Sequence, residues 1–274
     1  MPTRTVFFVS DQTGVTAETL GHSLLTQFDG LEFRPVTVPF VDSVDKVEQL
    51  ARRINTEAKE SGLRPIIFTS LVDEQLRARL LECNGLVLDF FAAFLAPLEQ
   101  ELETISSHAL GKPHRMADVA SYNLRIDAIN YAMASDDGHS TRHYSDADVI
   151  LTGVSRSGKT PTCLYLALQY GIFAANYPLA EEDLETGKLP ARLMEFKHKL
   201  YGLTITPERL RQIRLERRSV GRYASAQQVS FELRAAEGLF KRYNIPYIYT
   251  THCSVEEIAS TILSVTGIER RVRP

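Results

Sequence analysis

The segment Asp148-Val-Ile-Leu-Thr-Gly-Val-Ser-Arg-Ser-Gly-Lys-Thr160 is the most informative part of this 274-residue chain. Its second half, Gly153 to Thr160, matches the phosphate-binding pattern G-x-x-x-x-G-K-[ST] without a mismatch. An apolar run precedes this loop, and the sequence Cys-Leu-Tyr-Leu-Ala-Leu that begins at Cys163 has the composition of a helix. Strand, glycine-rich loop and helix in this order predict an α/β domain with a mostly parallel sheet that presents a P-loop.

Each residue type in the loop has a chemical reason to be there. The glycines let successive backbone N–H groups face a phosphate, and the following helix adds the positive end of its dipole. Lys159 is expected to bridge phosphate oxygens as a catalytic residue, and the Thr160 hydroxyl is expected to bind Mg²⁺. The predicted nucleotide- and phosphate-binding residues are Gly153, Val154, Ser155, Arg156, Ser157, Gly158, Lys159 and Thr160.

The acid that usually completes Mg²⁺ coordination does not follow the later strand that the sequence predicts. Residues 245–250 form that strand, and the chain continues from it as Thr-His-Cys. The nearest candidates are Asp136 and Asp137, just upstream of the P-loop strand. Either carboxylate could orient the metal or take the proton of a hydroxyl acceptor. The alternative is that Asp136-Asp137-Gly138 is a turn that ends a helix.

Strand–loop–helix units also fill the first hundred residues. The predicted strands are 5–10, 33–40, 65–70 and 85–89, and the predicted helices are 16–28, 44–61, 72–81 and 90–105. Two prolines in 33–40 indicate an edge strand. A polar segment at 106–115 is expected to link an N-terminal α/β domain (1–110) to a P-loop kinase-like domain (111–274). Further helices are predicted at 117–134, 226–243 and 255–266, whereas 176–224 is expected to hold loops and an arginine-rich stretch.

The arginine-rich stretch contains Arg209, Arg211, Arg214, Arg217, Arg218 and Arg222. In phosphoryl-transfer enzymes such a segment can form a lid that supplies arginine contacts to the leaving phosphate. We therefore predict that Arg217, Arg218 or Arg222 contacts phosphate. A docking face for a target protein and a solvated helix face are the alternatives.

Two further positions are candidates on weaker patterns. The turn that contains Asp11, Thr13 and Gly14 follows a strand and opens a helix, so its N–H groups could bind an anion in a target-binding or regulatory site. Any strand–helix turn has this appearance, however. His252 follows the predicted strand 245–250, where catalytic groups gather in α/β proteins, but it also lies in a helix-cap region.

Composition excludes several classes of protein. With 44% apolar and 24% charged residues the chain can build a core, and a net charge of −3 provides no general field for nucleic acid or anionic membranes. The three cysteines are far apart and form no C-x-x-C, which excludes a disulfide framework and a zinc ribbon. No apolar stretch is long enough to span a bilayer. We therefore expect a cytoplasmic protein that binds neither nucleic acid nor membrane.

The P-loop region closely resembles that of the bifunctional kinase–phosphorylase regulators of pyruvate-utilising dikinases. The likeness extends to landmarks over nearly the whole chain: Val9–Glu18, Asp136–Gly138, Ala174–Pro178, Lys199–Ile205, Arg217–Ser225 and Ser254–Ala259. With glycine at position 158, the loop resembles that of the branch of the family that acts on phosphoenolpyruvate synthase. The sister branch acts on pyruvate, phosphate dikinase.

This resemblance implies a specific activity. Such regulators use ADP to phosphorylate a threonine of the target enzyme, which inactivates it, and they remove the phosphate with inorganic phosphate, releasing pyrophosphate. It also implies phosphoenolpyruvate synthase as the protein substrate and favours a homodimer. The P-loop alone equally supports an ATP-dependent small-molecule kinase, and a nucleotide-sensing protein without catalysis is a third possibility.

Overall fold

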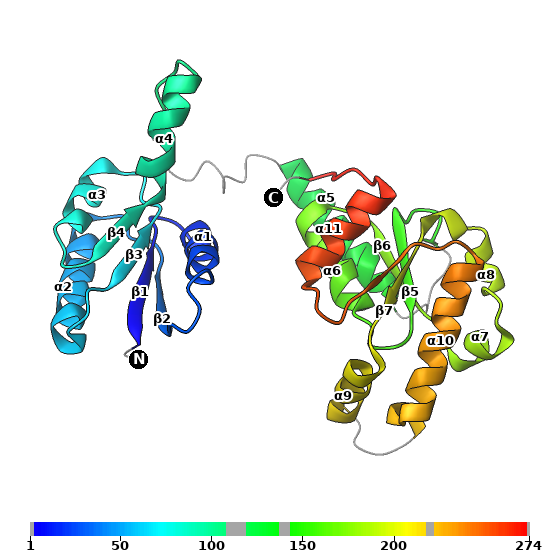
Figure 1. Cartoon of the computed structure of the whole chain (residues 1–274). Coiled ribbons are helices and arrows are strands. Elements are labelled where there is room, and N and C mark those ends of the chain that lie inside the picture. The colour runs from blue at the N-terminus through cyan, green and yellow to red at the C-terminus, as the bar shows by residue number, and fades with distance from the viewer. Residues whose placement is uncertain (1–2, 108–118, 137–142, 218–221, 273–274) are drawn as a thin grey trace. The chain divides into compact units, whose positions relative to one another are not determined.

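The computed structural model describes residues 3–107, 119–136, 143–217 and 222–272. The chain divides into two compact units, residues 1–115 and 116–274, and each is built around a four-stranded parallel sheet in its described part (Figure 1). The predicted α/β class with mostly parallel strands is therefore confirmed.

In the first unit the sheet has the order β2-β1-β3-β4. The elements are β1 (Arg4–Val9), α1 (Val15–Leu25), β2 (Phe33–Val38), α2 (Val44–Ser61), β3 (Ile66–Thr69), α3 (Glu74–Leu81), β4 (Leu86–Asp89) and α4 (Phe90–Glu101). Strand β2 lies at the edge, as the prolines of 33–40 predicted, because an edge strand needs fewer backbone donors; Pro35 lies within the strand and Pro39 directly after it.

The central strand β1 explains how this unit folds. Its side chains alternate between the two faces of the sheet. Val6 and Phe8 belong to a cluster with Ala17 of α1, and Phe7 and Val9 belong to one with residues of α2 and α3. Because helices cover both faces of the sheet, the consecutive apolar side chains of β1, Val6–Val9, are all buried and stabilise the unit.

In the second unit the sheet has the order β6-β5-β7-β8. The elements are α5 (Val119–Ala134), β5 (Val149–Gly153), α6 (Lys159–Tyr170), β6 (Ala174–Pro178), α7 (Glu181–Thr186), α8 (Ala191–Met194), η4 (Lys197–Lys199), β7 (Leu200–Thr204), α9 (Pro207–Arg217), η5 (Arg222–Ala224), α10 (Ala226–Arg242), β8 (Tyr247–Tyr249) and α11 (Val255–Thr266). Strand β5 is buried along its whole length, and the P-loop follows directly from it.

The prediction that residues 176–224 hold loops is wrong. This region contains most of β6, all of β7, and helices α7, α8 and α9. Strand β7 escaped notice because Gly202 interrupts its apolar pattern. A Cβ at Gly202 would lie 2.8 Å from the Phe240 ring and 2.8 Å from Cβ of Tyr247, so close packing of α10 and β8 requires glycine there.

In the described part of the chain, no helix has the length and apolar character needed to cross a membrane.

Candidate active site

The P-loop connects β5 to α6 in the manner that its sequence predicts. Gly153 has a φ of +148°, and a Cβ at this position would lie 2.2 Å from the carbonyl oxygen of Leu203. Only glycine therefore allows the loop to pass this close to β7. Gly158 adopts a left-handed conformation, with φ +95°, as the N-cap of α6. Helix α6 thus begins at Lys159, the predicted catalytic residue.

Lys159 is buried within the loop, with 4% of its surface exposed. Its ammonium donates a 2.7 Å hydrogen bond to the carbonyl oxygen of Val154. A buried ammonium needs such acceptors, because desolvation without partners is costly. The loop surrounds a cavity of about 540 Å³, whose lining includes Asp136, Ser155, Arg156, Gly158, Lys159, Thr160, Pro161, Asn176, Pro178 and Arg217.

Three side chains from separate segments meet at one wall of this P-loop cavity. The Thr160 hydroxyl donates to Asp136, with its oxygen 3.0 Å from Oδ1 and 3.3 Å from Oδ2. The Asn176 amide donates to Oδ1 of Asp136 at 2.5 Å and to Oγ1 of Thr160 at 3.1 Å. The carboxylate that sequence reasoning placed near Thr160 does contact it. Asn176 is not among the predicted site residues, because the sequence predicts loops over 176–224 and only the sheet shows that β6 brings this side chain to Asp136.

The donor chemistry of this cluster fits Mg²⁺. A carboxylate and a hydroxyl are hard oxygen ligands, and Mg²⁺ is commonly held by one or two such groups together with phosphate oxygens and water. The described residues include no group of three or more His, Cys, Asp or Glu side chains that could hold a metal ion by themselves. Asp136 and Thr160 are therefore the residues that could hold Mg²⁺, alongside a bound phosphate. Asp137 lies outside the described residues.

The neighbouring Cys163 has no catalytic character. It is buried beneath this cluster, and burial raises the pKa of its thiol, with the charge of Asp136 adding to the effect. A thiol in this environment stays protonated and is a poor nucleophile.

The arginines of the predicted lid have different surroundings. Arg217, the last residue of α9, lines the P-loop cavity. Arg222 instead forms a 2.6 Å ion pair with Glu181 and donates to Gln228 at 3.2 Å, so its described contacts are with protein groups. Arg218 lies outside the described residues. Of these three candidates, Arg217 is the one whose position the structure describes beside the P-loop.

A second, smaller cavity of about 270 Å³ adjoins the P-loop and shares Arg156, Gly158 and Pro161 with the first. Its remaining lining is largely apolar or uncharged, apart from one arginine: Ser157, Thr162, Ile205, Arg209, Ile213, Thr250, Thr251, Cys253, Val255 and Ile258. His252 is exposed between two of these residues but is not among those that line this cavity in the described chain.

The turn after β1 has the geometry of an anion site but the wrong charge. Gly14 is the left-handed N-cap of α1, and Thr13 is exposed beside it. Asp11, however, is 4% exposed, and its carboxylate accepts a 2.9 Å hydrogen bond from the amide of Val72. Burial raises the pKa of Asp11, which shows that its surroundings disfavour negative charge. This arrangement gives no support to a phosphate site at the turn.

Comparisons with known proteins identify the family of this chain. The model of the kinase/pyrophosphorylase family matches residues 6–263. Proteins named phosphoenolpyruvate synthase regulatory protein are similar over almost the whole length: 53% identical over 270 residues in Alcanivorax borkumensis, 54% over 269 residues in Alkalilimnicola ehrlichii, and 54% over 270 residues in Pseudomonas aeruginosa. Each alignment covers 98% of this chain and 98–99% of the relative. The chain therefore belongs to the kinase/pyrophosphorylase family of phosphotransferases.

Proposed function

We propose that this protein is an ADP-dependent protein kinase and phosphate-dependent phosphorylase that regulates phosphoenolpyruvate synthase. In the first reaction the β-phosphoryl group of ADP moves to a threonine oxygen of the target, and AMP leaves. In the second, an oxygen of inorganic phosphate attacks the phosphothreonine phosphorus, and pyrophosphate and the free threonine are formed. Its relatives carry the name of phosphoenolpyruvate synthase regulators, which supports this choice of target.

One P-loop suits both reactions because both move a phosphoryl group between threonine and an oxygen of a loop-bound phosphate. That phosphate belongs to AMP in one reaction and is free in the other. Neither reaction requires an attacking water, so positioning and charge stabilisation are the main tasks of the protein. In this proposal Lys159 stabilises charge on the phosphate oxygens, and Arg217, which lines the same cavity, also stabilises that charge.

Mg²⁺ is part of this proposal, with Thr160 and Asp136 as its protein ligands. When bound, the ion neutralises charge on the phosphates during transfer. Asn176 fixes the carboxylate of Asp136 through its amide, so that the oxygen donors keep one arrangement. Fixing the ligands in advance lowers the reorganisation needed during the reaction.

The second cavity gives the nucleoside of ADP a place next to the loop. Ligands of parallel α/β sheets bind at the carboxyl ends of the strands, where Ile205 follows β7 and Thr250 follows β8. Apolar side chains from α9 and α11, Ile213 and Ile258, suit the faces of a purine. Inorganic phosphate has no group to fill this space, so the cavity distinguishes the two substrates while the loop serves both.

The observation that carries the proposal is the meeting of Lys159, Thr160 and Asp136 around one cavity. The test uses purified phosphoenolpyruvate synthase with ADP labelled at the β-phosphate or ATP labelled at the γ-phosphate. We expect label on a threonine from ADP, and its release as pyrophosphate when inorganic phosphate is added. Transfer from ATP alone would contradict the proposal, as would nucleotide binding without any transfer.

Two other candidates are separated by the same assay. The sister branch of the resemblance acts on pyruvate, phosphate dikinase, so that enzyme replaces phosphoenolpyruvate synthase in a parallel reaction. An ATP-dependent small-molecule kinase, which a P-loop also suits, would label neither protein. Lys159→Ala serves as the negative control in each reaction.

A further inference from the structure

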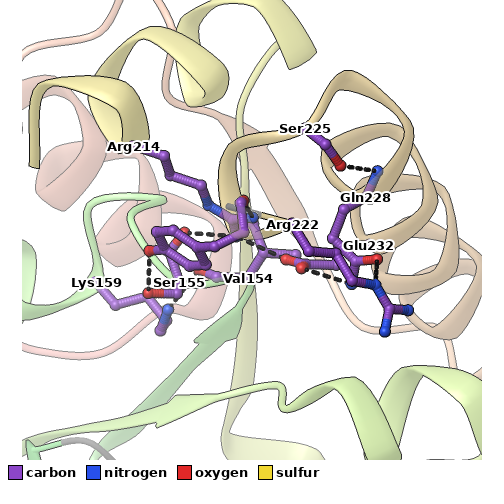
Figure 2. A network of polar contacts seen from close by, with 9 residues as sticks. Val154, Ser155, Lys159, Arg214, Arg222, Ser225, Gln228 and Glu232 are labelled. Carbon is purple, nitrogen blue, oxygen red and sulfur yellow. Dashed lines mark hydrogen bonds and ion pairs between the residues drawn. The ribbon is translucent and has the colours of Figure 1, made fainter. Parts of the chain in front are cut away.

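Among the described residues of the second unit, Arg214 is the most deeply buried charged side chain, with 0% of its surface exposed. It lies on α9, one turn before Arg217, and its guanidinium reaches toward the P-loop and α10. Figure 2 shows Arg214 between Ser155 and Glu232, which come from these two elements. A buried guanidinium is costly unless its charge is matched and its donors are satisfied. The partners of Arg214 therefore indicate what the residue does.

Three groups accept hydrogen bonds from Arg214. Nη2 donates to the carboxylate of Glu232 at 2.6 Å and to the backbone carbonyl of Ser155 at 3.2 Å, and Nη1 donates to the carbonyl of Tyr223 at 2.9 Å. The guanidinium also stacks 4.2 Å from the centroid of the Tyr223 ring. The hydroxyl of the same tyrosine lies 3.2 Å from Oγ of Ser155. Ser155 is thus held through both its backbone and its side chain.

The held peptide is a strained one. Arg156, the next residue, has a φ of +77°, which is unfavourable for a residue with a side chain. Such conformations persist where surrounding contacts impose them, and they are common at ligand sites. The peptide that joins Ser155 to Arg156 is planar and trans, so its carbonyl and its N–H point in opposite directions. Because Arg214 holds the carbonyl, the N–H of Arg156 is turned away from Arg214.

We propose that Arg214, supported by Tyr223, is a positioning residue that turns the Arg156 N–H into the P-loop cavity for phosphate binding. Ser155 and Arg156 both line that cavity, whereas Arg214 is not part of its described lining. Successive N–H groups that face one concavity form an anion site, and reversing one peptide replaces a donor with a carbonyl oxygen. Arg214 thus acts on phosphate through the loop and without contacting it.

Glu232 and Gln228 complete the support. The side-chain amide of Gln228 donates to Oε1 of Glu232 at 3.1 Å. Ser225 caps α10, because its hydroxyl oxygen accepts from the backbone N–H of Gln228 (Figure 2). The carboxylate that balances Arg214 is therefore itself fixed on α10. The Nε group of Arg214 has no hydrogen-bond partner in the described part of the chain, so this placement does not satisfy the arginine fully.

The test measures equilibrium binding of inorganic phosphate and of ADP by calorimetry, with thermal unfolding as a check on folding. Arg214→Lys keeps the charge but cannot reach three acceptors, and we expect both dissociation constants to rise by ~10-fold or more. Tyr223→Phe removes one hydrogen bond to Ser155 and should raise both by about threefold. Arg211→Lys, an exposed change on the same helix, is the matched control and should alter neither.

A double variant separates positioning from stability. Arg214→Met with Glu232→Met removes both charges together, so that neither is left buried alone, and we expect the unfolding temperature to stay near that of the original chain. Phosphate and ADP should still bind ~10-fold more weakly, because the Ser155 carbonyl is no longer held. Normal phosphate affinity in folded Arg214→Lys or in the double variant would overturn the proposal. If neither Arg214→Lys nor the double variant folds, normal phosphate affinity in Tyr223→Phe would overturn the proposal.

This inference rests on phosphate binding by the P-loop, which is part of the proposed function. It does not depend on the donor or on the protein target. If the transfer assay fails while phosphate affinity falls in the variants, the target assignment is wrong and the role of Arg214 stands. If transfer occurs and the variants bind phosphate normally, the role of Arg214 is wrong and the target assignment stands.

Discussion

The two units have the same strand order but differ in the turn after their first strand. In β2-β1-β3-β4 and in β6-β5-β7-β8 the first strand of the unit is the second in the sheet. Each first strand leads through a turn to a helix whose N-cap is a left-handed glycine, Gly14 with φ +84° and Gly158 with φ +95°. One turn then carries a buried carboxylate, Asp11, and the other a buried ammonium, Lys159.

This comparison separates what topology supplies from what the loop adds. Topology places a helix N-terminus at the carboxyl edge of the sheet in both units. The eight-residue loop adds backbone donors and a cation, whereas the carboxylate of Asp11 takes the Val72 amide for itself. We therefore expect phosphate at the turn of the second unit, where the loop supplies the cation of Lys159, and not at the turn of the first unit, where the Asp11 carboxylate is buried.

The largest expected effect comes from removing the cation that distinguishes the two turns. Lys159→Ala should lower the rates of threonine phosphorylation and of pyrophosphate release by ~10²–10³-fold, because charge stabilisation in the transition state is lost. Both reactions are measured with labelled substrates, and exposed Lys241→Ala is the control. If phosphorolysis persisted after phosphorylation was abolished, the reactions would use different sites, and the turn at Asp11 would become the place to look.

The next effect concerns Asp136, the carboxylate that contacts Thr160 in the second unit. Asp136→Asn should reduce transfer by ~10²-fold, because it removes the charge beside Thr160. Because Asp136 is a proposed Mg²⁺ ligand, the variant should also require a higher Mg²⁺ concentration for half-maximal activity. Rates are measured across a Mg²⁺ titration, with exposed Asp146→Asn as the control. Near-normal turnover of the folded variant would leave Asp136 as a structural turn residue.

A smaller and selective effect tests the second cavity beside the P-loop. Cys253→Phe places a ring in a space of about 270 Å³. The KM for ADP should rise by roughly 10-fold while the KM for inorganic phosphate stays the same, because a blocked nucleoside pocket affects one substrate. Leu168→Phe, an exposed change on α6, is the control. Equal changes in both KM values would show that the cavity does not hold the nucleoside.

The smallest effect is expected in the first unit and depends on pH. Because the folded-state pKa of Asp11 is raised, the stabilisation linked to this carboxyl is complete below its ordinary pKa and is lost as pH rises through the raised value. Asp11→Asn should therefore gain stability relative to the original chain as pH rises, because the amide does not ionise. Hydrogen exchange of the β1 amides across pH measures this, with exposed Asp29→Asn as the control. A difference that shrinks as pH rises would contradict the assignment.

The sequence was most informative where local chemistry determines structure. The glycines, lysine and threonine of the P-loop, the apolar strand before it and the prolines of 33–40 each act within a few residues. The capping box of α11 is another example: Ser254 and Glu257 exchange hydrogen bonds at 3.2 and 2.7 Å as their spacing predicts.

Other features depend on contacts between distant segments and could not be predicted. Strand β7 contains Gly202 because α10 and β8 pack against it, which no local pattern reveals. Asn176 reaches Asp136 across 40 positions, and Arg214 reaches Ser155 across 59. Arg214 appeared as one of six arginines in a charged stretch, yet burial gives it a role that its exposed neighbours do not share.

The uneven burial of the three cysteines gives the chain a natural position for chemical labelling. Cys83 and Cys163 are buried, and burial raises the pKa of both thiols, so alkylating reagents should react with them slowly. Cys253 is partly exposed and lines the smaller cavity beside the P-loop. A reagent attached there would occupy the space where the proposed function places the nucleoside. Selective alkylation of the unaltered chain should therefore weaken ADP binding, and bound ADP should slow the alkylation of Cys253.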